Sequence, residues 1–277
     1  MTMVQSGGNI SLLEKTYAFI LKNRVVNRAE LEYYAENILE KDYNYLYRKY
    51  IFKLMKQGKV ERIRKGLYFA KNIYIDEHGI PNKFLVGSKI RSPYYLGYHT
   101  ALEISGSAQS IHHGCYIAID INNRFKPFQY NDHRFHPVIV NDFEMGIIIR
   151  NVENFTVRIS SPSRTFVECI QRPDLCIGYE EVYKSLESLG GVEIEGLLSI
   201  LEMYHTDILY RTVGFFLDEL KERSPYYSHI GEKELNKIRK NIGNGRSYLI
   251  RGKKGEYISE WRLYIPEGFR DLFLGVR

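Results

Sequence analysis

A tyrosine-rich and basic segment near the N-terminus carries the side chains best suited to contact a polyanion. Residues 42–56 alternate tyrosines with lysines and arginine, and a second basic stretch follows over residues 59–69. Asn44 and Arg48 are four residues apart, which places them on one face of a helix. Because Asn makes bidentate hydrogen bonds to adenine and Arg makes them to guanine, this pair predicts contact with base edges in a DNA groove.

The other cations of the segment are better suited to phosphate oxygens. Such contacts fix the register of a protein on DNA but carry no sequence information. The residues assigned to this role are Lys49, Lys53, Lys56, Arg62, Arg64 and Lys65. Tyr45 could contact the nucleic acid by stacking or hydrogen bonding, or it could pack against the hairpin, and the sequence leaves both alternatives open.

Three short helices are expected to position these side chains. Ser11 is placed to cap a first helix that ends near Asn23. Asn27 followed by Glu30 has the spacing of a capping box and predicts the start of a second helix. The third helix is expected to begin after Asp42.

A hairpin follows the third helix. That helix is expected to bury Tyr43 and Tyr47, and strands over residues 60–63 and 67–70 then flank a turn in which Gly66 suits a positive φ. Three helices followed by a hairpin make a winged helix-turn-helix, whose third helix enters the major groove. The sequence therefore predicts such a domain at the N-terminus.

Charge separates this region from the rest of the chain. Residues 1–72 hold 14 Lys and Arg against 7 Asp and Glu, a net charge of +7, whereas the remaining residues are close to neutral at −1. A cationic domain attached to a neutral body indicates a polyanion partner for the domain alone. The alternative is a solvated cationic face on an ordinary helical bundle.

The expected organisation is α+β, with a winged-helix DNA-binding domain over residues 1–76 and a larger mixed α/β domain over residues 82–277. The segment His78–Asn82 contains Gly and Pro and predicts the linker, after a strand-like Ile73-Tyr-Ile. In the larger domain, helix-like and strand-like segments alternate, and Tyr257–Ile265 is expected to form a single strand near the end.

No arrangement of residues predicts catalysis. The histidines at 112–113 and in Asp132-His133-x-x-His136 are the best metal candidates, but a turn and a proline frame the second group, and surface histidines explain it better. Glu219-Leu-Lys221 has the acidic-x-Lys spacing of some nucleases, yet it falls on a helical pattern. We therefore expect no metal, no cofactor and no enzymatic activity.

The chain is expected to be cytoplasmic. Its three cysteines are an odd number without zinc-binding spacing, which is typical of reduced thiols. The N-terminus has no signal-peptide pattern, and no apolar run reaches the ~18 residues needed to span a bilayer. We expect no membrane partner.

Three blocks of the sequence resemble the AbiEi-type antitoxins of abortive-infection toxin–antitoxin systems. They are Tyr94–Gly106, Phe155–Asp174, which is the most specific, and Arg211–Leu220. The resemblance implies that the N-terminal domain binds inverted repeats in its own promoter and represses it. It also implies that the C-terminal domain opposes a cognate nucleotidyltransferase toxin.

The expected function is therefore that of a sequence-specific DNA-binding autorepressor, the antitoxin of a toxin–antitoxin pair. Two alternatives remain at the level of sequence. One is a metal-dependent DNA-processing enzyme that a winged helix positions on DNA, and the other is a regulator that senses a ligand or a protein without any toxin.

Overall fold

The structure, a computed structural model, describes residues 11–71, 80–253 and 255–274. It is a mixed α+β protein with three sheets among these residues. The chain forms two compact units, one of residues 1–92 with 129–133 and one of residues 93–128 with 134–277. The N-terminal unit thus extends past the boundary expected at residue 76. The expected strand at residues 73–75 and the start of the expected linker lie outside the described residues.

The helices of the N-terminal unit begin at the predicted caps. Ser11 caps α1 (Leu12–Asn23) and Asn27 caps α2 (Arg28–Ile38), each with a complete capping box. The side chain of Asp42 caps the third helical run, accepting a hydrogen bond from the backbone N–H of Tyr45 at 2.9 Å. Each cap satisfies a backbone donor that the first helical turn leaves without a partner.

The third helical run is not a uniform α-helix. It consists of α3 (Tyr43–Leu46), a π-helical turn η1 (Tyr47–Ile51) and α4 (Phe52–Lys56). Leu46, Ile51 and Leu54 are buried, whereas Tyr43 and Tyr47 are half-buried and pack against this core, so the expected burial of the two tyrosines is only partial. The π turn adds a residue to the helical repeat, which rotates the side chains after it relative to those before it.

A three-stranded sheet in the order β1-β3-β2 completes this part of the unit. Its strands are β1 (Val25–Asn27), which the sequence did not predict, β2 (Val60–Arg64) and β3 (Leu67–Ala70). The hairpin turn contains Gly66 with φ of +80°, as predicted, and the register of β2 on β3 shifts between Arg62 and Arg64. After the undescribed residues 72–79, the short helix α5 (Lys83–Ser88) belongs to the same unit.

A mixed six-stranded sheet has the order β6-β7-β5-β4-β9-β8, and all of it except residues 129–130 of β6 and His133 of β7 belongs to the larger unit. The pairs β5/β7 and β4/β9 are parallel, and the pairs β4/β5 and β8/β9 are antiparallel. The strands are β4 (Tyr94–Leu96), β5 (Gly114–Ile119), β6 (Phe128–Tyr130), β7 (His133–Ile139), β8 (Ile147–Val152) and β9 (Phe155–Ser160).

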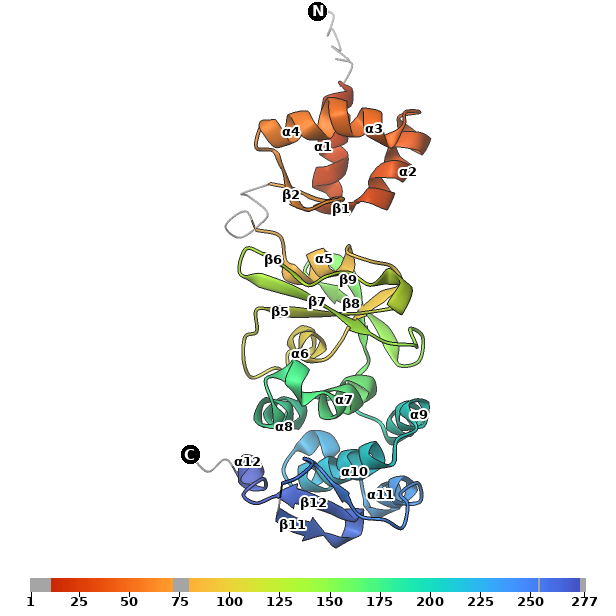
Figure 1. The fold of residues 1–277 in the computed structure, drawn as a ribbon, viewed down its shortest axis with the longest axis vertical. Helices are drawn as coiled ribbons and strands as arrows, with labels where there is room; N and C mark the ends of the chain where they lie inside the picture. The colour runs from red at the N-terminus through yellow and green to blue at the C-terminus, as the bar shows by residue number, and fades with distance from the viewer. Residues whose placement is uncertain (1–10, 72–79, 254, 275–277) are drawn as a thin grey trace, which may run out of the picture. The chain divides into compact units, whose positions relative to one another are not determined.

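The helices of the larger unit lie in layers next to the six-stranded sheet. A second, smaller sheet lies at the end of the unit farthest from the six-stranded sheet (Figure 1). The helices are α6 (His99–Ser105), α7 (Pro162–Gln171), α8 (Tyr179–Glu187), α9 (Ile194–Tyr204), α10 (Asp207–Lys221), α11 (Glu232–Arg239) and α12 (Asp271–Leu274). The smaller sheet has the order β10-β12-β11, with β10 (Ser247–Tyr248), β11 (Gly255–Ile258) and β12 (Leu263–Pro266).

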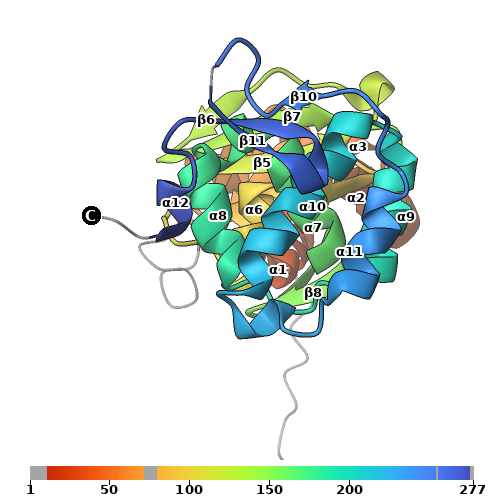
Figure 2. The ribbon, with the colours of Figure 1, turned by 90° about the horizontal axis from the view of Figure 1, so that it is seen from below.

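Helix α10 lies between α8 and α11 in the view along the long axis (Figure 2), and its residues from Leu209 to Leu220 are largely buried. Trp261 is fully buried and packs on the backbone of this helix. A Cβ atom added to Gly214 would lie 2.1 Å from the Trp261 ring, so only glycine fits there. Because Ser259–Trp261 forms a 3-10 turn, the expected single strand Tyr257–Ile265 is in fact two strands, β11 and β12.

No helix among the described residues is both long and apolar enough to cross a membrane.

Candidate nucleic-acid interface

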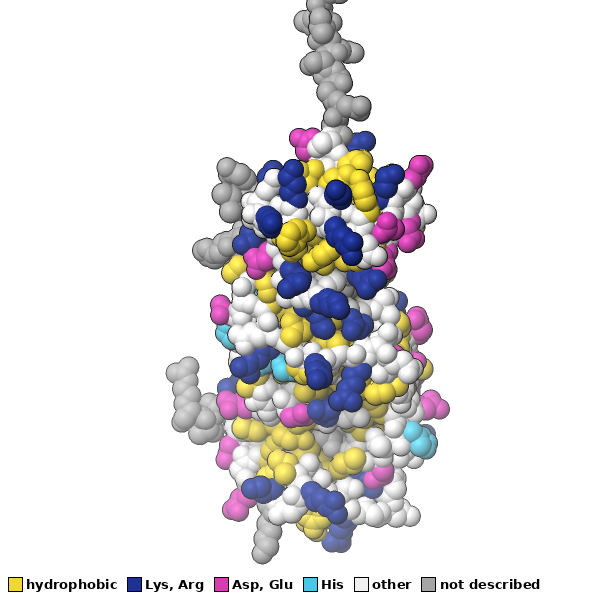
Figure 3. Space-filling model, turned by 45° about the horizontal axis from the view of Figure 1, so that its top comes forward, with side chains coloured by type: hydrophobic (Ala, Val, Ile, Leu, Met, Phe, Trp, Pro, Cys, Tyr) yellow, Lys and Arg dark blue, Asp and Glu magenta, His cyan; other side chains and the backbone are white. Residues whose placement is uncertain are grey.

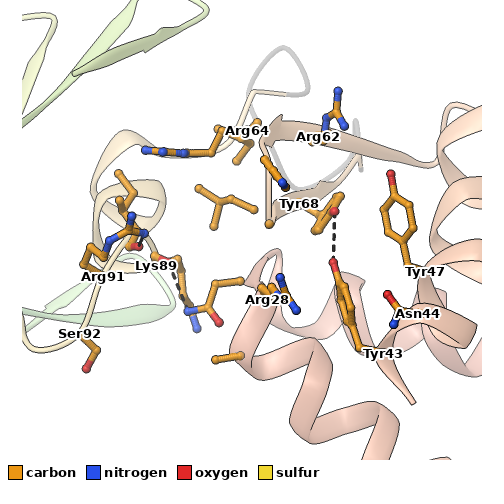
Figure 4. A pocket seen from close by; sticks show the side chains of 17 residues that line it. Arg28, Tyr43, Asn44, Tyr47, Arg62, Arg64, Tyr68, Lys89, Arg91 and Ser92 are labelled. Carbon is orange, nitrogen blue, oxygen red and sulfur yellow. Dashed lines mark hydrogen bonds between the residues drawn. The ribbon is translucent and has the colours of Figure 1, made fainter. Parts of the chain in front are cut away.

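An open pocket of about 1120 Å³ lies in the N-terminal unit, between the start of the third helical run and the β2–β3 hairpin. Six cations line it, and no Asp or Glu is among its lining residues. We call it the basic pocket, and its cations are Arg28, Arg62, Arg64, Lys65, Lys89 and Arg91. Figure 4 shows most of these side chains around it. Such a concentration of positive charge favours a polyanionic ligand.

Tyrosines form the other part of the lining. The hydroxyls of Tyr43 and Tyr68 point toward each other, 3.4 Å apart, and Tyr47 lies beside them (Figure 4). Burial, and then the hydrogen bond with Tyr43, raises the pKa of Tyr68. Tyr68 therefore remains a neutral phenol at physiological pH and adds no negative charge to the pocket.

Arg28 of α2 contacts Tyr43 of α3, and both residues line the basic pocket. It is the first residue of α2, and its guanidinium lies over the Tyr43 ring, with Cζ 5.0 Å from the centroid. The same guanidinium forms an ion pair with Glu32 at 2.7 Å. The stacking on Tyr43 is a cation–π contact that fixes the direction of the cation.

The chain after α5 supplies two further cations. The Lys89 ammonium pairs with the carboxylate of Glu30, and the carbonyl of Lys89 accepts a hydrogen bond from the Asn27 side chain at 3.3 Å. Arg91 donates to the carbonyl of Ile90 at 2.8 Å. These contacts hold residues 89–91 against the first turn of α2, so the basic pocket includes residues beyond the predicted domain.

Arg64 and Arg91 are close enough to influence each other. Burial, and then the positive charge of Arg91, lowers the pKa of Arg64. A guanidinium stays protonated at any physiological pH. The two charges therefore repel each other, and an anion placed between them would relieve that repulsion.

The predicted site residues divide into two groups. Asn44, Arg62, Arg64 and Lys65 line the basic pocket. The exposed side chains Arg48, Lys49, Lys53 and Lys56 lie outside it, along the third helical run. We call this second group the helical cations. In Figure 3 the visible face of the N-terminal unit carries many Lys and Arg side chains among hydrophobic ones, and its carboxylates lie mainly at the margins.

Tyr45 is half-buried and meets Tyr50 edge-on, with ring centroids 5.9 Å apart. Of the two roles considered for Tyr45, nucleic-acid contact and packing, the structure provides a contact for packing. That contact is with the helical run itself and not with the hairpin.

Six charged or aromatic lining residues were not predicted as site residues. They are Arg28, Tyr43, Tyr47, Tyr68, Lys89 and Arg91. Asn27 was recognised as a cap, and this alone could have placed Arg28 at an exposed helix start. No local pattern connects Lys89 or Arg91 with residues more than 20 positions earlier.

The alternative metal sites do not assemble among the described residues, where no group of three or more His, Cys, Asp or Glu could hold a metal ion. His133 and His136 lie on strand β7, not on a turn. Because side chains alternate along a strand, residues three apart point to opposite faces.

The comparisons with known proteins address the fold. No protein-family model matches the chain, and no curated protein matches its sequence. The structure is similar to the crystal structure of the Rv2827c protein from Mycobacterium tuberculosis, with a TM-score of 0.60 and 12% sequence identity. The match covers 96% of this chain and 95% of that one. It therefore extends over both units.

Proposed function

We propose that the N-terminal unit is a winged helix-turn-helix domain that binds duplex DNA. The observation that carries the proposal is the basic pocket, which the third helical run and the hairpin border and whose lining contains six cations and no Asp or Glu. Two of these cations, Arg28 and Lys89, are ion-paired with Glu32 and Glu30. In winged-helix proteins these two elements are the recognition helix and the wing. The pocket cations then contact phosphates, and Asn44 and Arg48 contact base edges.

The helical cations extend the same surface. Lys49, Lys53 and Lys56 are exposed, and none of them forms an ion pair with a carboxylate in the part of the chain that the structure describes. Cations that no carboxylate neutralises are available to phosphates and release condensed counterions when they bind. The π turn between Asn44 and Lys53 rotates the two ends of the run, which supports separate tasks for them.

We infer from the resemblance to AbiEi-type antitoxins that the protein is a transcriptional autorepressor that binds inverted repeats in its own promoter, in the cytoplasm. In this proposal the larger unit opposes a cognate nucleotidyltransferase toxin. The protein needs no cofactor and catalyses no reaction.

The two rival functions have weaker support. The acidic-x-Lys tripeptide lies on helix α10, where Lys221 pairs with Asp218 at 2.8 Å and with Glu232 at 3.1 Å. Glu219 itself pairs with Arg270 at 3.0 Å, so both charges of the tripeptide have partners without a metal. A cavity of about 290 Å³ near Tyr98 and Arg164 favours the ligand-sensing regulator, but Arg164 is already bonded to Glu168 at 2.8 Å.

The proposal is tested by footprinting the full-length protein on the DNA upstream of its own gene, with a promoter–reporter assay in parallel. We expect protection of an inverted repeat and reduced reporter expression. The variant Lys65→Glu should abolish both effects, and Lys15→Glu, which changes an exposed lysine on α1 outside the basic pocket, should retain both. Equal behaviour of the two variants would contradict the proposed surface.

A further inference from the structure

The small sheet of the larger unit carries a row of three tyrosines. Tyr248 of β10 is paired with Tyr264 of β12, which in turn is paired with Tyr257 of β11. Residues paired across strands place their side chains on the same face of the sheet. Leu263 and Ile265, on either side of Tyr264 in β12, point to the opposite face of the sheet and are buried. The tyrosines therefore occupy the outer face of the sheet.

The three rings form a column. Tyr248 and Tyr264 are stacked with centroids 4.8 Å apart and planes at 17°, and Tyr257 and Tyr264 are 4.9 Å apart at 42°. Tyr248 is 50% exposed and lies on β10, at the edge of the sheet. Among the described residues its only ring contact is with Tyr264. Its outward face can therefore accept one more flat ring.

One cation contacts the column, and two more lie in the turn that follows β10. The Arg246 guanidinium lies 5.0 Å from the centroid of the Tyr257 ring and donates to the hydroxyl of Tyr264 at 3.2 Å. Arg251 and Lys253 lie in the turn between β10 and β11, are exposed, and form no hydrogen bond or ion pair with any described side chain. The carboxylate of Glu256 on β11 is paired with Arg270 at 3.0 Å.

We propose that this face binds single-stranded RNA, with an unpaired base stacked on Tyr248 and phosphates held by Arg246, Arg251 and Lys253. Aromatic rings beside cations are the usual means of holding unpaired bases. A DNA duplex keeps its bases stacked inside the helix, whereas RNA loops and ends present them. The proposal concerns the larger unit and does not depend on DNA binding by the N-terminal unit.

Charge complementarity selects this occupant over a protein. The centre of a protein interface is depleted of charged residues and is closed off from water by its rim. The tyrosine column instead has a guanidinium in contact with two of its rings, and two further exposed cations follow Tyr248 in the turn between β10 and β11. This pattern fits a chain of bases and phosphates.

The test measures fluorescence anisotropy of a labelled single-stranded RNA decamer with the full chain, in the presence of excess unlabelled duplex DNA to occupy the N-terminal unit. Tyr248→Ala should weaken RNA binding about tenfold, and Tyr248→Phe should bind as the wild type does. The matched control is Tyr226→Ala, because Tyr226 is 52% exposed in the same unit and Tyr248 is 50% exposed.

A second variant does not alter the stacked rings. Arg251→Glu with Lys253→Glu should abolish binding of the RNA decamer and leave the thermal unfolding temperature unchanged, since both side chains are exposed. Three results would each overturn the proposal: wild-type RNA affinity in both the Tyr248→Ala and the double variant, complete displacement of RNA by duplex DNA, or equal affinity for single-stranded DNA of the same sequence.

Discussion

The guanidinium of Arg28 lies over the ring of Tyr43, with 5.0 Å between Cζ and the ring centroid, although the two residues begin different helices. This contact directs the Arg28 cation toward the basic pocket, which the first turn of the third helical run also lines. A residue outside the predicted recognition helix and wing thus becomes part of the proposed DNA-binding surface.

We predict that Arg28→Ala weakens DNA binding to all sequences alike. The variant removes one cation from the basic pocket, and a phosphate contact contributes affinity without base discrimination. The plot of log K against log salt should become shallower by about one unit. Anisotropy titrations at several salt concentrations measure this slope, with Lys15→Ala as the control. An unchanged slope would remove Arg28 from the interface.

Asn44 and Arg48 should determine base preference. Arg48→Ala is expected to cost about 1–3 kcal/mol of discrimination at one operator position, whereas Lys65→Ala should reduce affinity for specific and nonspecific DNA by the same factor. Binding measured on a set of operators with single base changes separates the two effects. If both variants lose affinity equally on every operator, Arg48 contacts only phosphate.

Arg91 should matter although it lies outside residues 1–76. It lines the basic pocket and its charge acts on Arg64. We expect Arg91→Ala in the full chain to lower DNA affinity and to reduce the salt slope by about one unit. Arg124→Ala changes an exposed arginine of the larger unit and serves as the control. Equal affinities of these two variants would restrict the interface to the predicted domain.

Gly214→Ala should destabilise the larger unit. The added methyl group would lie 2.1 Å from the ring of the buried Trp261, which must shift. Overpacking of this kind typically costs about 1–3 kcal/mol. Because Trp261 is the only tryptophan, its fluorescence during urea denaturation reports the change in the free energy of unfolding directly. An unchanged midpoint would mean that helix α10 moves away from the ring at little cost.

The stability of the larger unit should decrease in acid through Glu181. Burial alone acts to raise the pKa of this carboxyl, but hydrogen bonds from Ser110, Ser185 and Gln109 together hold it below its ordinary value. A carboxyl whose pKa is lowered by folding stabilises the folded state at pH values above the pKa that it has in the unfolded chain. This stabilisation is lost as the pH falls through the lowered pKa of the folded state. Glu181→Gln should therefore show a smaller difference in unfolding free energy between pH 7 and pH 4 than the wild type.

The parts of the fold that could be predicted depend on residues close together in sequence. Ser11, Asn27 and Asp42 cap helices within three positions, and Gly66 adopts the positive φ of a tight turn. These effects are local, so the amino-acid pattern is sufficient to predict them.

The missed features depend on contacts between distant residues. The β11–β12 hairpin was taken as one strand because the turn at Ser259–Trp261 is stabilised by the packing of Trp261 on α10, some 45 residues earlier. Tyr43 and Tyr47 were assigned to the core because aromatic residues at helical spacing usually are buried. No propensity predicts the π turn at Tyr47–Ile51, whose last residue, Ile51, is fully buried.

The central claim is that the cations of the basic pocket, together with Lys49, Lys53 and Lys56 of the third helical run, bind the phosphates of duplex DNA. The most direct test is the affinity of the full-length protein for the duplex upstream of its own gene, measured from low to high salt. If about six phosphates are contacted, log K should fall against log salt with a slope of about −5. An affinity that does not change with salt, or no binding at low salt, would contradict the claim.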